Sequence, residues 1–359
     1  LVLAGGGDPT LETHRLATLA AALSGAGVRG VTGRFLLWSG ARPALERIDT
    51  DQPDHVGYNP ALSGLNLNFN RVHFEWRRAG KGWNLGFDAR GKTLVPKVSF
   101  ATMQLSARER PLFTYAREGE VEHWTVAEPA LGKGGARWLP TRMPAQYAGA
   151  VFRDLALAQG IKLPAPTLTD AAPMGEVLAR DRSEDLAGVL RGMLEHSTNI
   201  TAELVGLAAT GAGGIAASAA AMTAWAGPGF GFVDHSGLGA GARVTPQAMA
   251  QAMARLSSGP LPALLKDHGM RDAKGKRIDG HPVQVRAKTG TLNFASALTG
   301  IINLPSGRRM AFATIAADLD RRAAIPPDQR ENPEGNSAWT KRARLLQARL
   351  IERWAAVYA

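Results

Sequence analysis

The last third of the chain predicts a β-hairpin that is followed by a long helix. Two strand-length apolar runs, residues 298–304 and 309–317, flank a Pro-Ser-Gly turn at residues 305–307, which is typical of a hairpin. A further strand is predicted from residue 284, and a helix from about residue 337 to 357. Because helices both precede and follow the hairpin, the pattern favours an antiparallel sheet covered by helices, an α+β fold.

The tetrapeptide Lys288-Thr289-Gly290-Thr291 lies between two apolar, strand-like runs. In an extended strand, Lys288 and Gly290 face one side and the two threonines face the other. Gly290 leaves room for the backbone of a substrate, and the Thr291 N–H can donate to an oxyanion. The hydroxyls of Thr289 and Thr291, with the charge of Lys288, suit a substrate carboxylate. Taken alone, the tetrapeptide is also compatible with a surface turn.

A second polar cluster, Ser197-Thr198-Asn199, precedes a helical segment that continues through Leu207. Ser197 can simply cap that helix. The alternative is that Ser-x-Asn and Lys-Thr-Gly are two of the three signatures of the penicillin-recognising serine acyl-transferases. The third signature, Ser-x-x-Lys, supplies the nucleophile, and no serine in this chain is followed by a lysine at that spacing.

Composition and spacing exclude other kinds of chemistry. The chain contains no cysteine, which excludes disulfides, thiolate metal sites and a cysteine nucleophile. Its eight histidines show no His-Glu-x-x-His or comparable spacing, so we expect neither a metal ion nor another cofactor. Asp234-His235-Ser236 contains the residue types of a catalytic triad, but adjacent residues cannot place their side chains in relay geometry.

The net charge of +11 arises from 42 Lys and Arg residues against 31 Asp and Glu residues. Such a charge can attract anionic cell-wall polymer, membrane lipid or nucleic acid, and scattered basic residues also simply keep a protein soluble. The basic clusters are short, such as Arg77-Arg78 and Arg308-Arg309, and no nucleic-acid-binding motif accompanies them. We therefore favour solubilising charge and expect no nucleic-acid partner.

The longest uncharged stretch runs from Leu204 to Val233 and is rich in alanine. Several glycines and Pro228 interrupt it, whereas a membrane span is more uniformly hydrophobic. The stretch therefore predicts two small-residue helices joined by a glycine loop, and we expect no transmembrane segment.

The first part of the chain reads as β-rich and the later part as more helical. Residues 5–10 predict a tight turn before a helix over residues 11–24. Residues 65–76 alternate in two phases, which predicts a bulge or turn near Asn70-Arg71. The chain becomes mainly helical after Pro140, so we expect a division into residues 1–140 and 141–359.

As an ordered set, the motifs resemble the low-molecular-mass penicillin-binding proteins that act as D-alanyl-D-alanine carboxypeptidases and endopeptidases. The resemblance spans nearly the whole chain and is carried, in the family's order, by residues 6–11, 63–70, 147–150, 193–203, 234–238, 243–246 and 287–292. It implies a transpeptidase domain of the penicillin-binding-protein and β-lactamase type, with its C-terminal part in residues 141–359. Residues 1–140 would form inserted, β-rich domains.

The resemblance also implies a function. It is that of a periplasmic bacterial enzyme that cleaves peptidoglycan stem peptides through an acyl-enzyme and is acylated by β-lactam antibiotics. Carried over to this sequence, Ser197 would help to move the proton and Asn199 would bind the substrate amide. Lys288, Thr289 and Thr291 would hold the substrate carboxylate and the oxyanion.

The chain departs from the family at the nucleophile. The family's Ser-x-x-Lys precedes the segment matched by residues 6–11, and this chain opens at Leu1. We therefore expect an N-terminal segment to be absent and the 359 residues alone to be inactive. Thr198 stands where the family usually has an acid, and His235 where glycine is common. The alternatives are a non-catalytic peptidoglycan-binding protein that lost its nucleophile, and a β-lactamase or esterase on the same scaffold.

Overall fold

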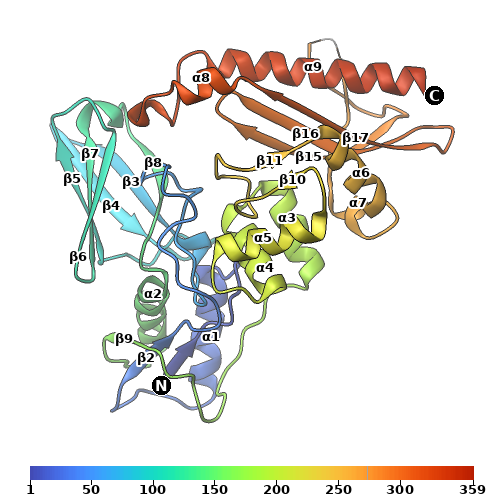
Figure 1. Ribbon diagram of the computed structural model, residues 1–359. Coiled ribbons are helices and arrows are strands. Elements are labelled where there is room, and N and C mark those ends of the chain that lie inside the picture. Colours follow the sequence, from blue (N-terminus) through green and yellow to red (C-terminus); the bar gives the residue numbers. More distant parts are fainter. Residues whose placement is uncertain (273) are drawn as a thin grey trace. The chain divides into compact units, whose positions relative to one another are not determined.

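The computed structural model describes residues 1–272 and 274–359 and contains two compact units. Unit 1 comprises Leu1–Glu184 and Asn199–Ser218, and unit 2 comprises Asp185–Thr198 and Ala219–Ala359. The elements of both units are labelled in Figure 1. Helices and small sheets occur in each unit, which agrees with the predicted α+β class. The predicted division at residue 140 separates inserted domains from the rest of the transpeptidase domain. It stays a prediction.

A small parallel sheet and two helices form the first layer of unit 1. The sheet has the order β1-β2-β9, with β1 at Val2–Ala4, β2 at Phe35–Trp38 and β9 at Pro166–Thr169. The helices are α1 at Thr13–Gly25 and α2 at Pro144–Ala158. Their apolar faces share one core with the sheet, in which Leu16, Phe35 and Tyr147 are fully buried. The helix expected over residues 11–24 is thus confirmed.

Two three-stranded sheets make up the β-rich part of unit 1. One has the order β4-β3-β8, formed by Gly82–Asp88, Arg71–Ala79 and Gly135–Pro140. The other has the order β5-β7-β6, formed by Ala101–Ser106, Val121–Ala127 and Phe113–Glu118. A short 3₁₀ helix at Glu128–Leu131 joins β7 to β8. Trp124 on β7 belongs to the same buried core as the first layer.

The turn expected near Asn70 is present. Asn68, Phe69 and Asn70 form a short 3₁₀ turn with φ values of 50°, 58° and 54°, and β3 begins at the next residue. Asparagine tolerates this left-handed region better than most residues because its amide can bond to nearby backbone. Here Asn70 Oδ1 accepts from the Leu67 N–H at 3.1 Å. The turn therefore separates the two phases of alternation that the sequence shows over residues 65–76.

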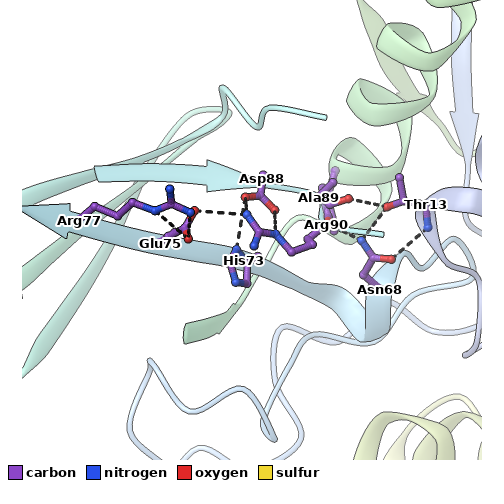
Figure 2. Close-up of polar contacts among 9 residues, drawn as sticks. Thr13, Asn68, His73, Glu75, Arg77, Asp88, Ala89 and Arg90 are labelled. Atoms are coloured by element: carbon purple, nitrogen blue, oxygen red, sulfur yellow. Dashed lines mark hydrogen bonds and ion pairs between the residues drawn. The ribbon is translucent and has the colours of Figure 1, made fainter. Parts of the chain in front are cut away.

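A chain of polar contacts runs from this turn along β3 and β4, as Figure 2 shows. Asn68 accepts from the Thr13 N–H at 3.1 Å and donates to the Thr13 hydroxyl at 2.9 Å, which ties the turn to α1. On the strands, Asp88 accepts from Arg90 at 2.9 Å and lies 3.3 Å from His73 Nδ1. Because buried carboxylates need such partners, these contacts stabilise the β3–β4 pair.

Helix α4, at Asn199–Thr210, begins the second segment of unit 1. Its residues Ile200, Leu204 and Leu207 pack on Leu62. A glycine-containing loop leads to α5 at Ile215–Ala226, so the two short helices expected in the uncharged stretch are confirmed. Within residues 1–272 and 274–359, no single helix has the length and hydropathy to cross a membrane, although the bent pair α4 and α5 meets these two criteria together.

An antiparallel sheet with the order β12-β15-β16-β17 forms the centre of unit 2. Its strands are Lys266–Asp267, Gln284–Leu292, Ala295–Asn303 and Arg309–Ala317. The long helix α9, at Asn336–Val357, runs along one face of the sheet (Figure 1). There Val285, Ile302 and Ile351 share a core. The predicted hairpin and the terminal helix that returns across it are confirmed.

The opposite face of this sheet packs on shorter helices. These are α3 at Leu186–His196, α6 at Pro246–Leu256 and α7 at Leu261–Leu264. Ile301 of β16 contacts a second core with Met253 and Leu265, against which Leu194 of α3 packs. The remaining elements are β10 at Phe230–Gly231, β11 at Arg243–Val244, β13 at Met270–Arg271, β14 at Arg277–Ile278, α8 at Leu319–Ala323 and a 3₁₀ turn at Pro327–Gln329.

Candidate functional site

Two of the sequence motifs meet in unit 2. Lys288 lies on β15, and its Nζ donates a hydrogen bond to the Oγ of Ser197 at 2.5 Å. Ser197 directly follows α3 and is 91 residues earlier in the chain. The contact joins the sheet to the end of α3. The structure therefore brings together two side chains that the sequence related only by motif type.

Ser197 has an unusual backbone conformation. It forms the C-cap of α3 with φ 55° and ψ 50°, in the left-handed region. Non-glycine residues seldom adopt this region because Cβ crowds the following carbonyl, and such strain clusters at functional sites. The hydroxyl oxygen accepts from Lys288. Ser197 thus has a hydrogen-bond partner on the sheet. This contact goes beyond the simple helix cap that the sequence also allowed.

The Lys288 amine lies in a half-buried and electropositive place. Its Nζ also donates to the carbonyl oxygen of Thr289 at 2.6 Å. Burial, and secondly the nearby ammonium of Lys266 on β12, lower the pKa of Lys288 below its ordinary value. Both causes disfavour the charged amine. Lys288 therefore releases its proton more readily than a lysine in water does.

One edge of β15 is open beside Lys288. The short strand β12 pairs with β15 only at Arg286 and Ala287. Further along, β16 covers the inner edge, and no strand of the described chain pairs with the outer edge of residues 288–292. The backbone N–H and C=O groups of such an edge can pair with an added extended peptide. The edge is thus free to pair with an extended peptide beside the Ser197–Lys288 contact.

The other members of the predicted tetrapeptide lie on this edge. Thr289, Gly290 and Thr291 are exposed. A Cβ on Gly290 would lie 3.5 Å from the Cβ of Ala297, which is an ordinary contact. The fold therefore does not itself require glycine at position 290, and the space above it is open to a ligand.

Asn199 belongs to unit 1, because the division between the units falls between Thr198 and Asn199. It is the first residue of α4, and its Nδ2 donates to the carbonyl oxygen of Tyr58 at 2.9 Å. This bond fixes the orientation of the amide. Its expected contact with a substrate stays a prediction.

The Asp234-His235-Ser236 sequence, which we rejected as a triad, forms a loop in unit 2. The carboxylate of Asp234 accepts from the N–H groups of Gly237 and Gly239 at 2.5 and 2.6 Å. The carboxylate therefore holds its own turn. Within residues 1–272 and 274–359, no group of three or more His, Asp and Glu side chains is arranged to hold a metal ion.

Sequence reasoning missed two residues around the site. Lys266 lowers the pKa of Lys288 from a neighbouring strand. Arg344 on α9 donates from Nη2 to the Thr291 Oγ1 at 3.2 Å. Neither residue belongs to a recognisable motif. Only the pairing of β12 with β15, and the packing of α9 on the sheet, could have indicated them.

Comparisons with known proteins agree on one family and one fold. The sequence profile of the D-Ala-D-Ala carboxypeptidase 3 (S13) family matches residues 1–333. The structure is similar to penicillin binding protein 4 from Haemophilus influenzae, with a TM-score of 0.69, 17% identity and coverage of 99% of this chain and 82% of that chain. The same protein complexed with a novel β-lactam gives a TM-score of 0.66, 17% identity and coverage of 99% and 81%. No curated protein matches the sequence. The predicted α+β fold of the penicillin-binding type is confirmed.

Proposed function

We propose that this chain, which belongs to the D-Ala-D-Ala carboxypeptidase 3 (S13) family, forms most of a serine-type active site that cleaves peptidoglycan stem peptides. The family supports a penicillin-binding, D-Ala-D-Ala carboxypeptidase-type hydrolase. The observation that carries the proposal for this chain is the hydrogen bond from Lys288 Nζ to Ser197 Oγ. It places a lysine of lowered pKa and a hydroxyl side by side at an open strand edge, where a peptide bond can be presented.

The contact provides a path for the proton. Because Lys288 donates to the Ser197 oxygen, the hydroxyl hydrogen of Ser197 is free to point toward a substrate. In acyl transfer, a bond forms between the nucleophilic serine oxygen and the carbonyl carbon, and the bond to the D-alanine nitrogen breaks. The leaving amine takes a proton from Ser197, Lys288 replaces that proton, and Lys288 in turn receives the proton that the attacking hydroxyl releases. Water then hydrolyses the acyl-enzyme.

The open edge of β15 binds the substrate in this proposal. An extended peptide pairs with residues 288–292, and the hydroxyls of Thr289 and Thr291 donate to its terminal carboxylate. The Thr291 N–H faces the developing oxyanion, where fixed donors lower the barrier. The role of Asn199 in binding a substrate amide stays a separate proposal, and its Nδ2 is held by Tyr58 within unit 1.

In this proposal the nucleophilic serine is not one of the 359 residues. No Ser-x-x-Lys sequence occurs in the 359 residues, so we take the attacking serine from another part of the protein. β-Lactams acylate that serine because they present a strained carbonyl and a carboxylate in the place of the D-Ala-D-Ala terminus. Because the proposed substrate is peptidoglycan, we propose a periplasmic location, which fractionation of the producing cells tests.

The experiment compares four compounds with the complete protein: a fluorescent penicillin, a D-Ala-D-Ala peptide, a cross-linked peptide and a cephalosporin. A fluorescent penicillin should label it, and a peptide ending in D-Ala-D-Ala should release D-alanine. A cross-linked peptide measures endopeptidase activity in the same assay. A complete protein that binds the peptide but stays unlabelled would establish the non-catalytic alternative. Faster turnover of a cephalosporin than of the peptide would establish a β-lactamase.

Replacing Lys266 with glutamine should change the pH dependence of acylation. The mutation removes the ammonium that helps to lower the pKa of Lys288, so this pKa should rise. If protonated Lys288 must donate to Ser197, acylation fails as pH rises through the pKa of Lys288. The alkaline limb of the acylation rate should therefore move to higher pH.

The measurement is the rate of labelling by fluorescent penicillin across the alkaline range. Lys276→Gln is the matched control, because it also removes an exposed lysine charge but does not contribute to the shift at Lys288. An alkaline limb that stays in place, or one that moves equally in both variants, would contradict the assigned role.

A further inference from the structure

The hydroxyl of Thr291 has a partner outside the signature motifs. Arg344 Nη2 donates to Thr291 Oγ1 at 3.2 Å, across 53 residues of sequence. Arg344 lies on α9, the helix that covers the sheet face to which Thr291 points. Lys288 lies on the opposite face of β15 and contacts Ser197 there. Arg344 is thus a cation from outside the tetrapeptide that contacts it on the α9 side.

The position of Arg344 is set by a buried contact one helical turn further on. Gln347 is 5% exposed, and its Nε2 donates to both the carbonyl and the hydroxyl oxygen of Ser296 at 3.2 Å. Ser296 pairs directly with Thr291 in the β15–β16 register. Because residues three apart on a helix are neighbours, the Gln347 contact holds Arg344 beside Thr291.

The guanidinium of Arg344 is not neutralised. The side chain is exposed, and no carboxylate of the described chain lies within ion-pair distance of it. Arginine carries five N–H donors, so donors remain after the bond to Thr291. A planar guanidinium beside an exposed hydroxyl is well suited to a carboxylate.

The bond also fixes what the Thr291 hydroxyl can do. Arginine can donate but cannot accept a hydrogen bond. A bond from Arg344 therefore occupies one lone pair of Oγ1, and the hydroxyl hydrogen must point to another acceptor. Thr291 is thereby oriented as a donor at the open strand edge.

We propose that Arg344 is a positioning residue for recognition of a free C-terminal carboxylate. It acts through the Thr291 hydroxyl and through its own positive charge, which lies beside the place where the carboxylate binds. This inference rests on the proposed function and deepens it. It predicts that the protein prefers peptides ending in a free carboxylate over the same peptides ending in an amide. Arg344 should add to the preference that Lys288 and the threonines already give.

The test compares two peptides that end in D-Ala-D-Ala, one with a free carboxylate and one with a C-terminal amide. In the complete protein, Arg344→Ala should raise KM for the carboxylate peptide about ten- to hundredfold with little change in kcat. The values for the amide peptide should stay the same. Arg344→Lys, which keeps the charge but not the planar fork, should restore part of the loss.

Arg349→Ala is the matched control, because Arg349 is also exposed on α9. Equal losses for carboxylate and amide in Arg344→Ala, or the same loss in Arg349→Ala, would overturn the inference. The dissociation constants of both peptides, from nuclear magnetic resonance titration, are measured on the same proteins. If wild type hydrolyses neither peptide, the proposed hydrolysis fails, and the carboxylate-to-amide ratio of dissociation constants still decides the role of Arg344.

Discussion

Lys288→Ala should slow acylation of the complete protein by fluorescent penicillin by about a hundred- to ten-thousandfold, the range for a lost proton-transfer group. The amine is the group that donates to Ser197 Oγ at 2.5 Å. Without it, the proton given by Ser197 to the leaving group is not replaced, and the positive charge beside the carboxylate site is lost. The rate of labelling, measured on a gel over time, tests the expectation.

The fold should tolerate this change. Burial and Lys266 lower the pKa of Lys288, so the folded protein destabilises the charged form of this amine. The unfolded chain binds the proton more readily than the folded protein does. Stability therefore rises with pH between the lowered folded pKa and the ordinary value, and Lys288→Ala should remove that rise. Urea unfolding at several pH values measures it.

Lys288→Arg is the control for charge, since it keeps a cation but cannot give up its proton. It should remain as slow as Lys288→Ala if proton transfer is the main role. Acylation at the wild-type rate in Lys288→Ala would remove the basis for the proposed site.

Gly300→Ala should destabilise unit 2 by about 3 kcal/mol, at the upper end of typical overpacking costs. Gly300 lies on β16, between Ala287 of β15 and Phe312 of β17. A Cβ at this position would lie 2.1 Å from the Arg286 carbonyl oxygen and 2.7 Å from the Ala287 Cα. Both are backbone atoms, so relief requires β15 to move away from β16. Such a shift also displaces Lys288, and acylation should fall with stability.

Gly290→Ala provides the matched comparison ten residues earlier. Its Cβ would lie 3.5 Å from that of Ala297, so the free energy of unfolding should stay within about 1 kcal/mol of wild type. Acylation should still fall, because the added methyl group stands where the substrate backbone approaches. Urea unfolding and penicillin labelling of both variants give the result. Equal stability of Gly300→Ala and Gly290→Ala would contradict the close approach at Gly300.

The elements of unit 2 could be predicted well because their signals are local. The expected hairpin strands, residues 298–304 and 309–317, lie within β16 and β17 apart from the last residue of the first, and the expected helix over 337–357 is α9. Alternation on β15 also placed Lys288 and Thr291 on different faces. Periodicity reports burial of neighbouring residues, and these strands bury one set of side chains against α9.

Pairings between distant segments could not be predicted in the same way. The parallel pair of β2 with β9 joins residues 35–38 to residues 166–169, and each of these strands is only four residues long. A strand of that length carries little periodic signal. The short β12, which positions Lys266, has two residues and carries none.

The sequence by itself determined the family, the reactive residue types and the strands and helices that carry them, because motifs and periodicity depend on neighbouring residues. The tertiary structure alone decided that Ser197 accepts from Lys288, that Lys266 lowers the pKa of that amine, and that Arg344 contacts Thr291. Each of these relations joins residues from different elements. They depend on strand register and helix packing, in which the whole buried core of unit 2 takes part.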